Sequence, residues 1–200
     1  MTGETGDEQT TSEQLEEWLH SDRKKTMGDL VDTFGPRSFA VLFVVLMALP
    51  ALPLPTGAVS HVLEVLTMLL ALELMVGRTE VWIPKRFEDR ELKGLTGPRF
   101  SAALLKRIRW FEKFSRRRMT GLVEHRLTGM VFGAAVFGFA LTAFLAPPFS
   151  GLDTLPSLGV VVLGLGVLLG DIVIAGIGLG VGAVGVVVVV GLGKAVTKLF

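Results

Sequence analysis

The stretch Leu49-Pro-Ala-Leu-Pro-Leu-Pro-Thr-Gly57 interrupts two long apolar runs, residues 39–49 and 59–76, neither of which contains Lys or Arg. Proline has no backbone N–H and ends or kinks a helix, so this stretch predicts a turn between two apolar helices. A second such turn follows, because Pro147-Pro-Phe-Ser-Gly151 repeats the P-x-x-[ST]-G spacing of Pro53–Gly57, again between apolar runs. The pattern predicts two helical hairpins, each folded at a Pro turn. The hinge residues are Pro50, Pro53, Pro55, Gly57, Pro147, Pro148 and Gly151.

The distribution of charge indicates an integral membrane protein. Half of the residues are hydrophobic, the mean hydropathy is +0.57, and 14 of the 20 Lys and Arg residues lie between Arg78 and Arg126. A soluble protein of this size disperses its charges over its surface, whereas this chain leaves long stretches without any. The segregation therefore disfavours the alternative, a soluble helical bundle. Because the chain has no Cys, disulfides and thiolate chemistry are excluded.

Four ionisable residues in or next to the apolar runs are candidates for binding a substrate or an ion: Arg37, His61, Glu64 and Asp171. His61 and Glu64 are three positions apart, so they share one face of a helix. A carboxylate at membrane depth costs on the order of 3 kcal/mol unless it is paired, protonated or in contact with water. One hypothesis places Arg37, Glu64 and Asp171 in a polar site around the two Pro turns. The alternative is that His61 lies in the headgroup zone and Glu64 is shallow.

Residues 99–118 predict a basic amphipathic helix. Phe100, Leu104, Ile108 and Phe111 follow the helical period and form an apolar stripe. An apolar stripe flanked by cations is typical of a helix that lies in the plane of an anionic leaflet. A nucleic-acid interface would use the same cations, but the apolar runs on both sides favour lipid. The cations expected to contact headgroups are Lys106, Arg107, Arg109, Arg116, Arg117 and Arg118.

The expected organisation is an all-α integral membrane protein with one membrane domain, residues 26–200. Before it, residues 1–25 form an acidic tail that is disordered or contains a short helix. Within the domain, 26–77 is the first hairpin half, 78–126 the basic interfacial linker, and 127–200 the second half. The second half ends in a Gly/Val-rich membrane segment, for which helix is favoured because lipid offers the backbone no hydrogen-bond partner.

The positive-inside rule places the N-terminus and the basic linker in the cytoplasm and both Pro turns on the far side of the membrane. Several features stay open at this point. The first leg of each hairpin either crosses the bilayer or re-enters, and the two halves form a parallel or an inverted repeat. The last segment either crosses fully, which leaves Lys194 and Lys198 outside, or turns at residues 176–185 and keeps them inside.

An ordered set of motifs then resembles a known family. The motifs are Gly28-Asp-Leu30, Gly35-Pro-Arg-Ser-Phe39, Leu49-Pro-Ala-Leu-Pro-Leu-Pro55, Gly77-Arg78 with Trp82-Ile-Pro84, Trp110-Phe-Glu112, Pro147-Pro-Phe149, Leu155-Pro-Ser-Leu158 and Gly170-Asp171. From Thr26 to about Gly193, the chain resembles the ExoD family of bacterial exopolysaccharide-synthesis membrane proteins. It departs from the family pattern at Glu73, often Gln, near Ser150-Gly151, where Asn is common, and at Ile172, often Gly. The resemblance implies an inner-membrane protein connected with exopolysaccharide production, and it brings no catalytic residue.

Two functions follow as expectations. The first is a non-enzymatic, multi-pass protein of the bacterial inner membrane that takes part in exopolysaccharide synthesis or export as a small transporter or ion-coupled module. The alternative is a membrane-anchored scaffold that recruits a partner or anionic lipid through the basic helix 99–118. No catalytic triad, phosphate loop or metal cluster is present, and His61 and Glu64 supply only two metal ligands, so neither enzyme, metal nor cofactor is expected. The expected partners are the bilayer, anionic headgroups and the exopolysaccharide machinery, but not nucleic acid; homo-oligomerisation stays open.

Overall fold

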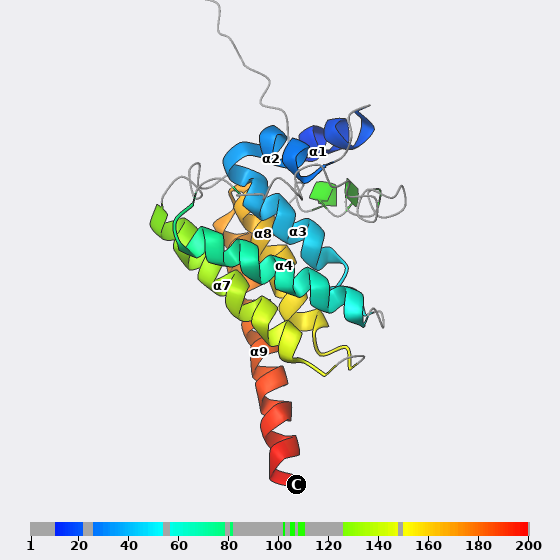
Figure 1. Cartoon of the computed structure of the whole chain (residues 1–200), viewed down its shortest axis with the longest axis vertical. Coiled ribbons are helices and arrows are strands. Elements are labelled where there is room, and N and C mark those ends of the chain that lie inside the picture. The colour runs from blue at the N-terminus through cyan, green and yellow to red at the C-terminus, as the bar shows by residue number, and fades with distance from the viewer. Residues whose placement is uncertain are drawn as a thin grey trace, which may run out of the picture.

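The computed structural model describes residues 11–21, 26–53, 57–78, 81, 102, 105–106, 108–110, 126–147 and 150–199. Within these residues every regular element is helical, which confirms the all-α expectation (Figure 1). A 3₁₀ turn, Gly35–Arg37, joins the second helix to the third. The helices are α1 (Thr11–His20), α2 (Met27–Phe34), α3 (Ser38–Ala48), α4 (Ala58–Met75), α7 (Arg126–Leu145), α8 (Thr154–Leu169) and α9 (Ile172–Leu199).

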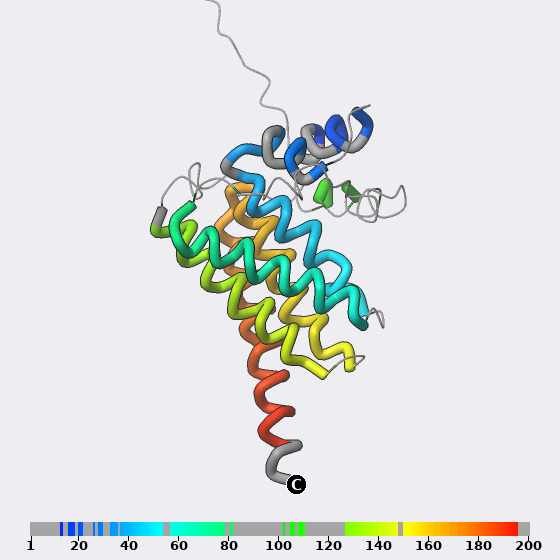
Figure 2. The backbone as a smooth tube through the Cα atoms, in the orientation of Figure 1, coloured from blue at the N-terminus to red at the C-terminus, as the bar shows by residue number. Residues whose placement is uncertain are grey.

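Four of these helices form a bundle. α3 returns through the first Pro turn into α4, and α7 returns through the second Pro turn into α8. α4 packs mainly along α7, and α3 packs mainly along α8. Both Pro turns lie at the same end of this bundle (Figure 2), which is called the Pro-turn end below. Gly57 and Gly151 have φ angles of 52° and 69° there, a left-handed region that glycine adopts without a Cβ clash.

The core of the bundle is formed by the two shorter helices. Every residue of α3 from Ser38 to Met47 is buried, and most of α8 is buried as well. A helix that is apolar all round must lie inside the protein or the membrane, and α3 lies inside the protein. Phe43 of α3 meets Phe132 of α7 edge to face, with ring centroids 5.5 Å apart, so the two hairpins share one core.

Three longer helices carry the surface that suits a membrane. The segments Ala58–Met75, Leu127–Leu145 and Ile172–Ala195 are long and apolar enough to cross a bilayer, with mean hydropathies of 1.7, 1.9 and 2.7. Each of these helices exposes several large apolar side chains, mostly Val, Leu and Ile, and a large exposed apolar surface is rare in a soluble monomer. By contrast, α3 and α8 have 11 and 16 residues, fewer than a crossing helix needs. The chain is therefore a helical membrane protein whose apolar helices differ in length.

Glycines bring α9 into backbone contact with α8. A Cβ added at Gly159 would lie 2.4 Å from the Cα of Gly182, and one added at Gly178 would lie 2.2 Å from the backbone nitrogen of Leu163. Close approach through small residues is a common way for membrane helices to pack. α9 is continuous over 28 residues, so the expected alternative of a turn at 176–185 is wrong. The glycines in that range form a packing surface and do not break the helix.

Candidate functional site

The best candidate site lies on α4, close to the Pro-turn end. The helix begins directly after Gly57, and its inward face carries Ser60, Glu64 and Thr67, all buried. The side chain of Glu64 is 0% exposed, and its Oε2 lies 3.4 Å from Nδ1 of His61. The sequence prediction that His61 and Glu64 share a helix face is therefore confirmed.

This pair lacks hydrogen bonds. Neither carboxylate oxygen of Glu64 nor Nδ1 of His61 has a hydrogen-bond partner among the described residues. The 3.4 Å separation is within ion-pair distance, but its geometry is not that of a hydrogen bond. A buried carboxyl group without a hydrogen bond is costly when charged, so it requires a proton, a cation or water.

The neighbouring hairpin covers the pair. The ring of His61 packs against that of Phe144 on α7, with centroids 5.2 Å apart and planes tilted by 51°. The His61 side chain is 29% exposed, whereas Glu64 is fully enclosed. His61 is therefore the more accessible member of the pair, and Glu64 is the buried one.

A second carboxylate acts on Glu64 from the start of α8. Asp153 directly precedes α8, and the negative charges of Asp153 and Glu64 repel each other. The first turn of the same helix also buries the hydroxyls of Thr154 and Ser157, neither of which has a hydrogen-bond partner within the described residues. Burial of the Glu64 carboxyl group and the added negative charge of Asp153 both favour binding of a proton or a cation at Glu64. His61, Glu64, Phe144 and Asp153 are called the Glu64 site below.

The sequence did not indicate Asp153 and Phe144 as members of the Glu64 site. One signal was available: the glycine of each Pro turn is followed three residues later by a hydroxyl, Ser60 after Gly57 and Thr154 after Gly151. This match places the first turns of α4 and α8 at equivalent positions of the two hairpins. It does not show that an acid next to one turn acts on the other.

Two other predicted site residues lie elsewhere. Arg37 is exposed in the 3₁₀ turn before α3, and Asp171 lies between α8 and α9. The turn before α3 and the connection between α8 and α9 both lie at the end of the bundle opposite the Pro turns (Figure 1), so the hypothesis that these two residues share a site with Glu64 is wrong. Asp171 has a structural role: its Oδ1 accepts hydrogen bonds from the backbone N–H groups of Val173 (2.8 Å) and Ile174 (3.4 Å) and caps α9.

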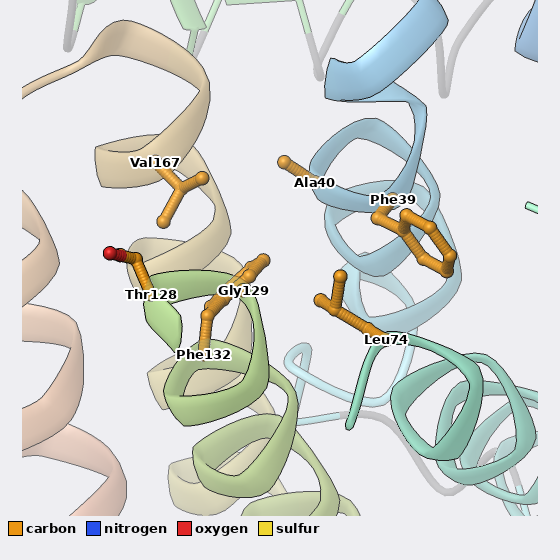
Figure 3. A pocket seen from close by; sticks show the side chains of 7 residues that line it. All are labelled: Phe39, Ala40, Leu74, Thr128, Gly129, Phe132 and Val167. Carbon is orange, nitrogen blue, oxygen red and sulfur yellow. The ribbon is translucent and has the colours of Figure 1, made fainter. Parts of the chain in front are cut away.

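A crevice at that opposite end does not suit an organic ligand. Its volume is about 10 Å³, close to what one water molecule needs. Its lining is almost wholly apolar, and Figure 3 shows the side chains around a shared gap between α3, α4, α7 and α8. The lining residues are Phe39, Ala40, Leu74, Thr128, Gly129, Phe132 and Val167.

The described part of the basic linker contacts α1. Arg109 forms an ion pair and hydrogen bond with Glu16 of α1, while Lys106 is exposed. Leu105 and Ile108 are buried beside these cations, as an amphipathic helix would require. The remaining predicted headgroup ligands, Arg107, Arg116, Arg117 and Arg118, lie outside the described residues, as do the hinge prolines Pro55 and Pro148.

The remaining hinge residues have distinct environments. Pro50, at the start of the first Pro turn, is buried, whereas Pro53 and Pro147 are exposed.

No group of three or more His, Cys, Asp or Glu residues that could hold a metal ion occurs in the described part of the chain.

Comparison with known proteins gives one family. The family model described as "Exopolysaccharide synthesis, ExoD" matches residues 11–191. A curated relative, "Uncharacterized protein slr1875" of Synechocystis sp., is 28% identical over 141 residues, which cover 70% of this chain and 66% of that protein. The chain thus spans just under two thirds of the length of this relative. No solved structure matches.

Proposed function

Because the chain belongs to the ExoD family of exopolysaccharide-synthesis proteins, we propose that it is a non-enzymatic, ion-coupled component of the bacterial inner membrane. Family membership implies a role in exopolysaccharide synthesis. The finer proposal is that the Glu64 site binds a proton or a cation during synthesis or export. The observation that carries it is the fully buried Glu64 carboxyl group, which lies beside His61 and has no hydrogen bond among the described residues.

The buried carboxyl group of Glu64 is costly to keep charged. A structural carboxylate inside a protein is normally held by hydrogen bonds or a cation, because an unpaired buried charge is strongly destabilising. Within the described part of the chain, no Lys or Arg forms an ion pair with Glu64, and Asp153 adds a second negative charge. A group in this environment gains most from reversible binding of a positive ion. That property is what an ion-coupled membrane protein requires.

The proposed topology follows from charge and from the arrangement of the hairpins. Residues 1–36 and the linker 78–126 lie in the cytoplasm, and the two hairpins enter the membrane from that side. The packing of α4 on α7 and of α3 on α8 is what a twofold relation between the hairpins requires. Both Pro turns at one end favour a parallel over an inverted repeat.

The test compares two carboxylates on the same helix. Glu64→Gln keeps the shape of the buried side chain but cannot take up a proton, and Glu73→Gln is the matched control, at a position where the family often has Gln. We expect Glu64→Gln to abolish proton flux in dye-loaded proteoliposomes and exopolysaccharide production in cells, at an unchanged membrane level. Glu73→Gln should retain both. Normal flux and normal production in Glu64→Gln would remove the ion-coupled proposal.

A scaffold function is the second candidate. It is favoured by the exposed Lys106 and Trp110, which lie beside the buried Leu105 and Ile108 and form a polar, aromatic surface suited to anionic headgroups. If the protein is a scaffold, the expected partner is the exopolysaccharide machinery, anionic lipid or a second copy of the chain. Nucleic acid is not an expected partner. Lys106→Glu should then abolish production while Glu64→Gln does little, which is the reverse of the first proposal.

A further inference from the structure

α9 runs antiparallel to α8 and is much longer than it. The contacts that fix their alignment are backbone approaches at glycines, spaced regularly along both helices. In order along α9, the facing pairs are Ala175 with Gly166, Gly178 with Leu163, Gly182 with Gly159, and Gly185 with Pro156. Because α8 begins at Thr154, only two residues before Pro156, the paired part of α9 ends close to Gly185.

Beyond Gly185, α9 continues past the first residue of α8, and Val186 still packs against the core. Lys194 is nine residues further on, about 13 Å along the helix axis at the α-helical rise. Figure 1 shows this part of α9 extending past both Pro turns. The segment 186–193 is uncharged, and Val187 is 71% exposed. A valine-rich helix surface of this kind is stable in contact with acyl chains but not with water.

The length of the apolar part of α9 matches a bilayer. The uncharged run 172–193 spans about 33 Å as a helix, close to the hydrocarbon thickness of ~30 Å. One end of this run is level with the bundle end opposite the Pro turns, and the other is close to Lys194. A membrane that covers the whole run also covers the Pro-turn end, because the turns lie between these two levels.

The Pro turns themselves have the composition of buried rather than hydrated loops. The stretch 49–57 has no charged residue, and 145–151 has none either. Leu52 at the tip of the first turn is 44% exposed and Leu145 before the second is 67% exposed. Exposed leucines at or next to both turns would be unfavourable in water and are favourable in hydrocarbon.

Three backbone donors in the described parts of the turns are satisfied within the protein. The N–H groups of Ala51 and Leu52 donate to Met47 and Leu49, and that of Ser150 donates to Pro147. Each proline removes one further donor, since its nitrogen carries no hydrogen. In hydrocarbon every unpaired N–H is costly, so prolines and internal hydrogen bonds are what a turn at membrane depth requires.

From these observations we propose that both Pro turns end inside the far half of the bilayer, covered by lipid acyl chains, and that α9 alone completes the crossing. This refines the expectation of Pro turns on the far side, which places them in water. Lys194 is then the inner boundary of the far headgroup layer. The inference does not depend on ion binding at Glu64.

The test uses single cysteines, because the natural chain has none. Ser150→Cys and Leu52→Cys report on the two turns, Ala195→Cys on the end of α9, and Lys106→Cys is the cytoplasmic control. A membrane-impermeant maleimide should label Ala195→Cys in intact cells and Lys106→Cys only after permeabilisation. Both turn variants should react at least about tenfold more slowly than Ala195→Cys, because a thiol in hydrocarbon is neither ionised nor reached by a charged reagent.

Three results would overturn the proposal. If Ser150→Cys or Leu52→Cys reacts as fast as Ala195→Cys, the turns lie in water. If Ala195→Cys reacts only after permeabilisation, α9 does not complete the crossing. If Val187→Cys forms disulfide-linked dimers upon oxidation, the occupant of this surface is a second copy of the chain and not lipid.

Discussion

The close contact between α8 and α9 gives the sharpest test of the fold. In a Gly159→Ala variant, the added methyl group would lie 2.4 Å from the Cα and 2.6 Å from the backbone nitrogen of Gly182. Backbone atoms of a helix cannot rotate away as a side chain does, so the two helices must separate. Forcing an extra methyl group into a packed core costs typically 1–3 kcal/mol, and we expect about 2 kcal/mol here.

The matched control is Gly176→Ala on α9, where an added Cβ meets no atom within 4 Å. For a chain of this size, about 2 kcal/mol lowers the Tm by roughly 4–8 °C. We expect that decrease for Gly159→Ala in thermal unfolding of the detergent-solubilised protein, followed by circular dichroism. Gly176→Ala should keep or raise the Tm, since alanine favours a helix over glycine. Equal Tm values for the two variants would refute the α8–α9 alignment.

Two further predictions concern polar contacts. Asp171→Ala should lower the free energy of unfolding by about 1 kcal/mol, because the α9 cap is lost. Asp171→Asn should have the wild-type Tm, because Asn is an equally good cap. A loss of function in Asp171→Asn without a loss of Tm would instead indicate a role for the charge. Glu16 and Arg109 are 38% and 52% exposed, so a double-mutant cycle on their ion pair should give a coupling below about 1 kcal/mol. A coupling well above that value would contradict the exposed geometry.

The sequence was most informative where the signal is local. The prolines and glycines of the two turns predicted both hairpins, because a proline interrupts a helix whatever surrounds it. The three-residue spacing of His61 and Glu64 likewise predicted their contact. These features depend on a few neighbouring residues and on one helix period.

Features that depend on the packing of distant helices were not predictable in the same way. The effect of Asp153 on Glu64 joins residues of two different hairpins, and no local pattern in the sequence indicates it. Asp171 was assigned to a Pro-turn site, although α8 carries it to the opposite end. The glycines of α9 permitted either a turn or close packing, and the contact with α8 determines which occurs.

The central claim is that the Glu64 carboxyl group binds and releases a proton or a cation. Infrared difference spectroscopy of the protein in lipid, recorded while the pH is changed, observes the carbonyl stretch of a protonated carboxyl group directly. We expect a pH-dependent band that is present in the wild type and in Glu73→Gln, is absent from Glu64→Gln, and is altered by a bound cation. Identical difference spectra for the wild type and Glu64→Gln would contradict it.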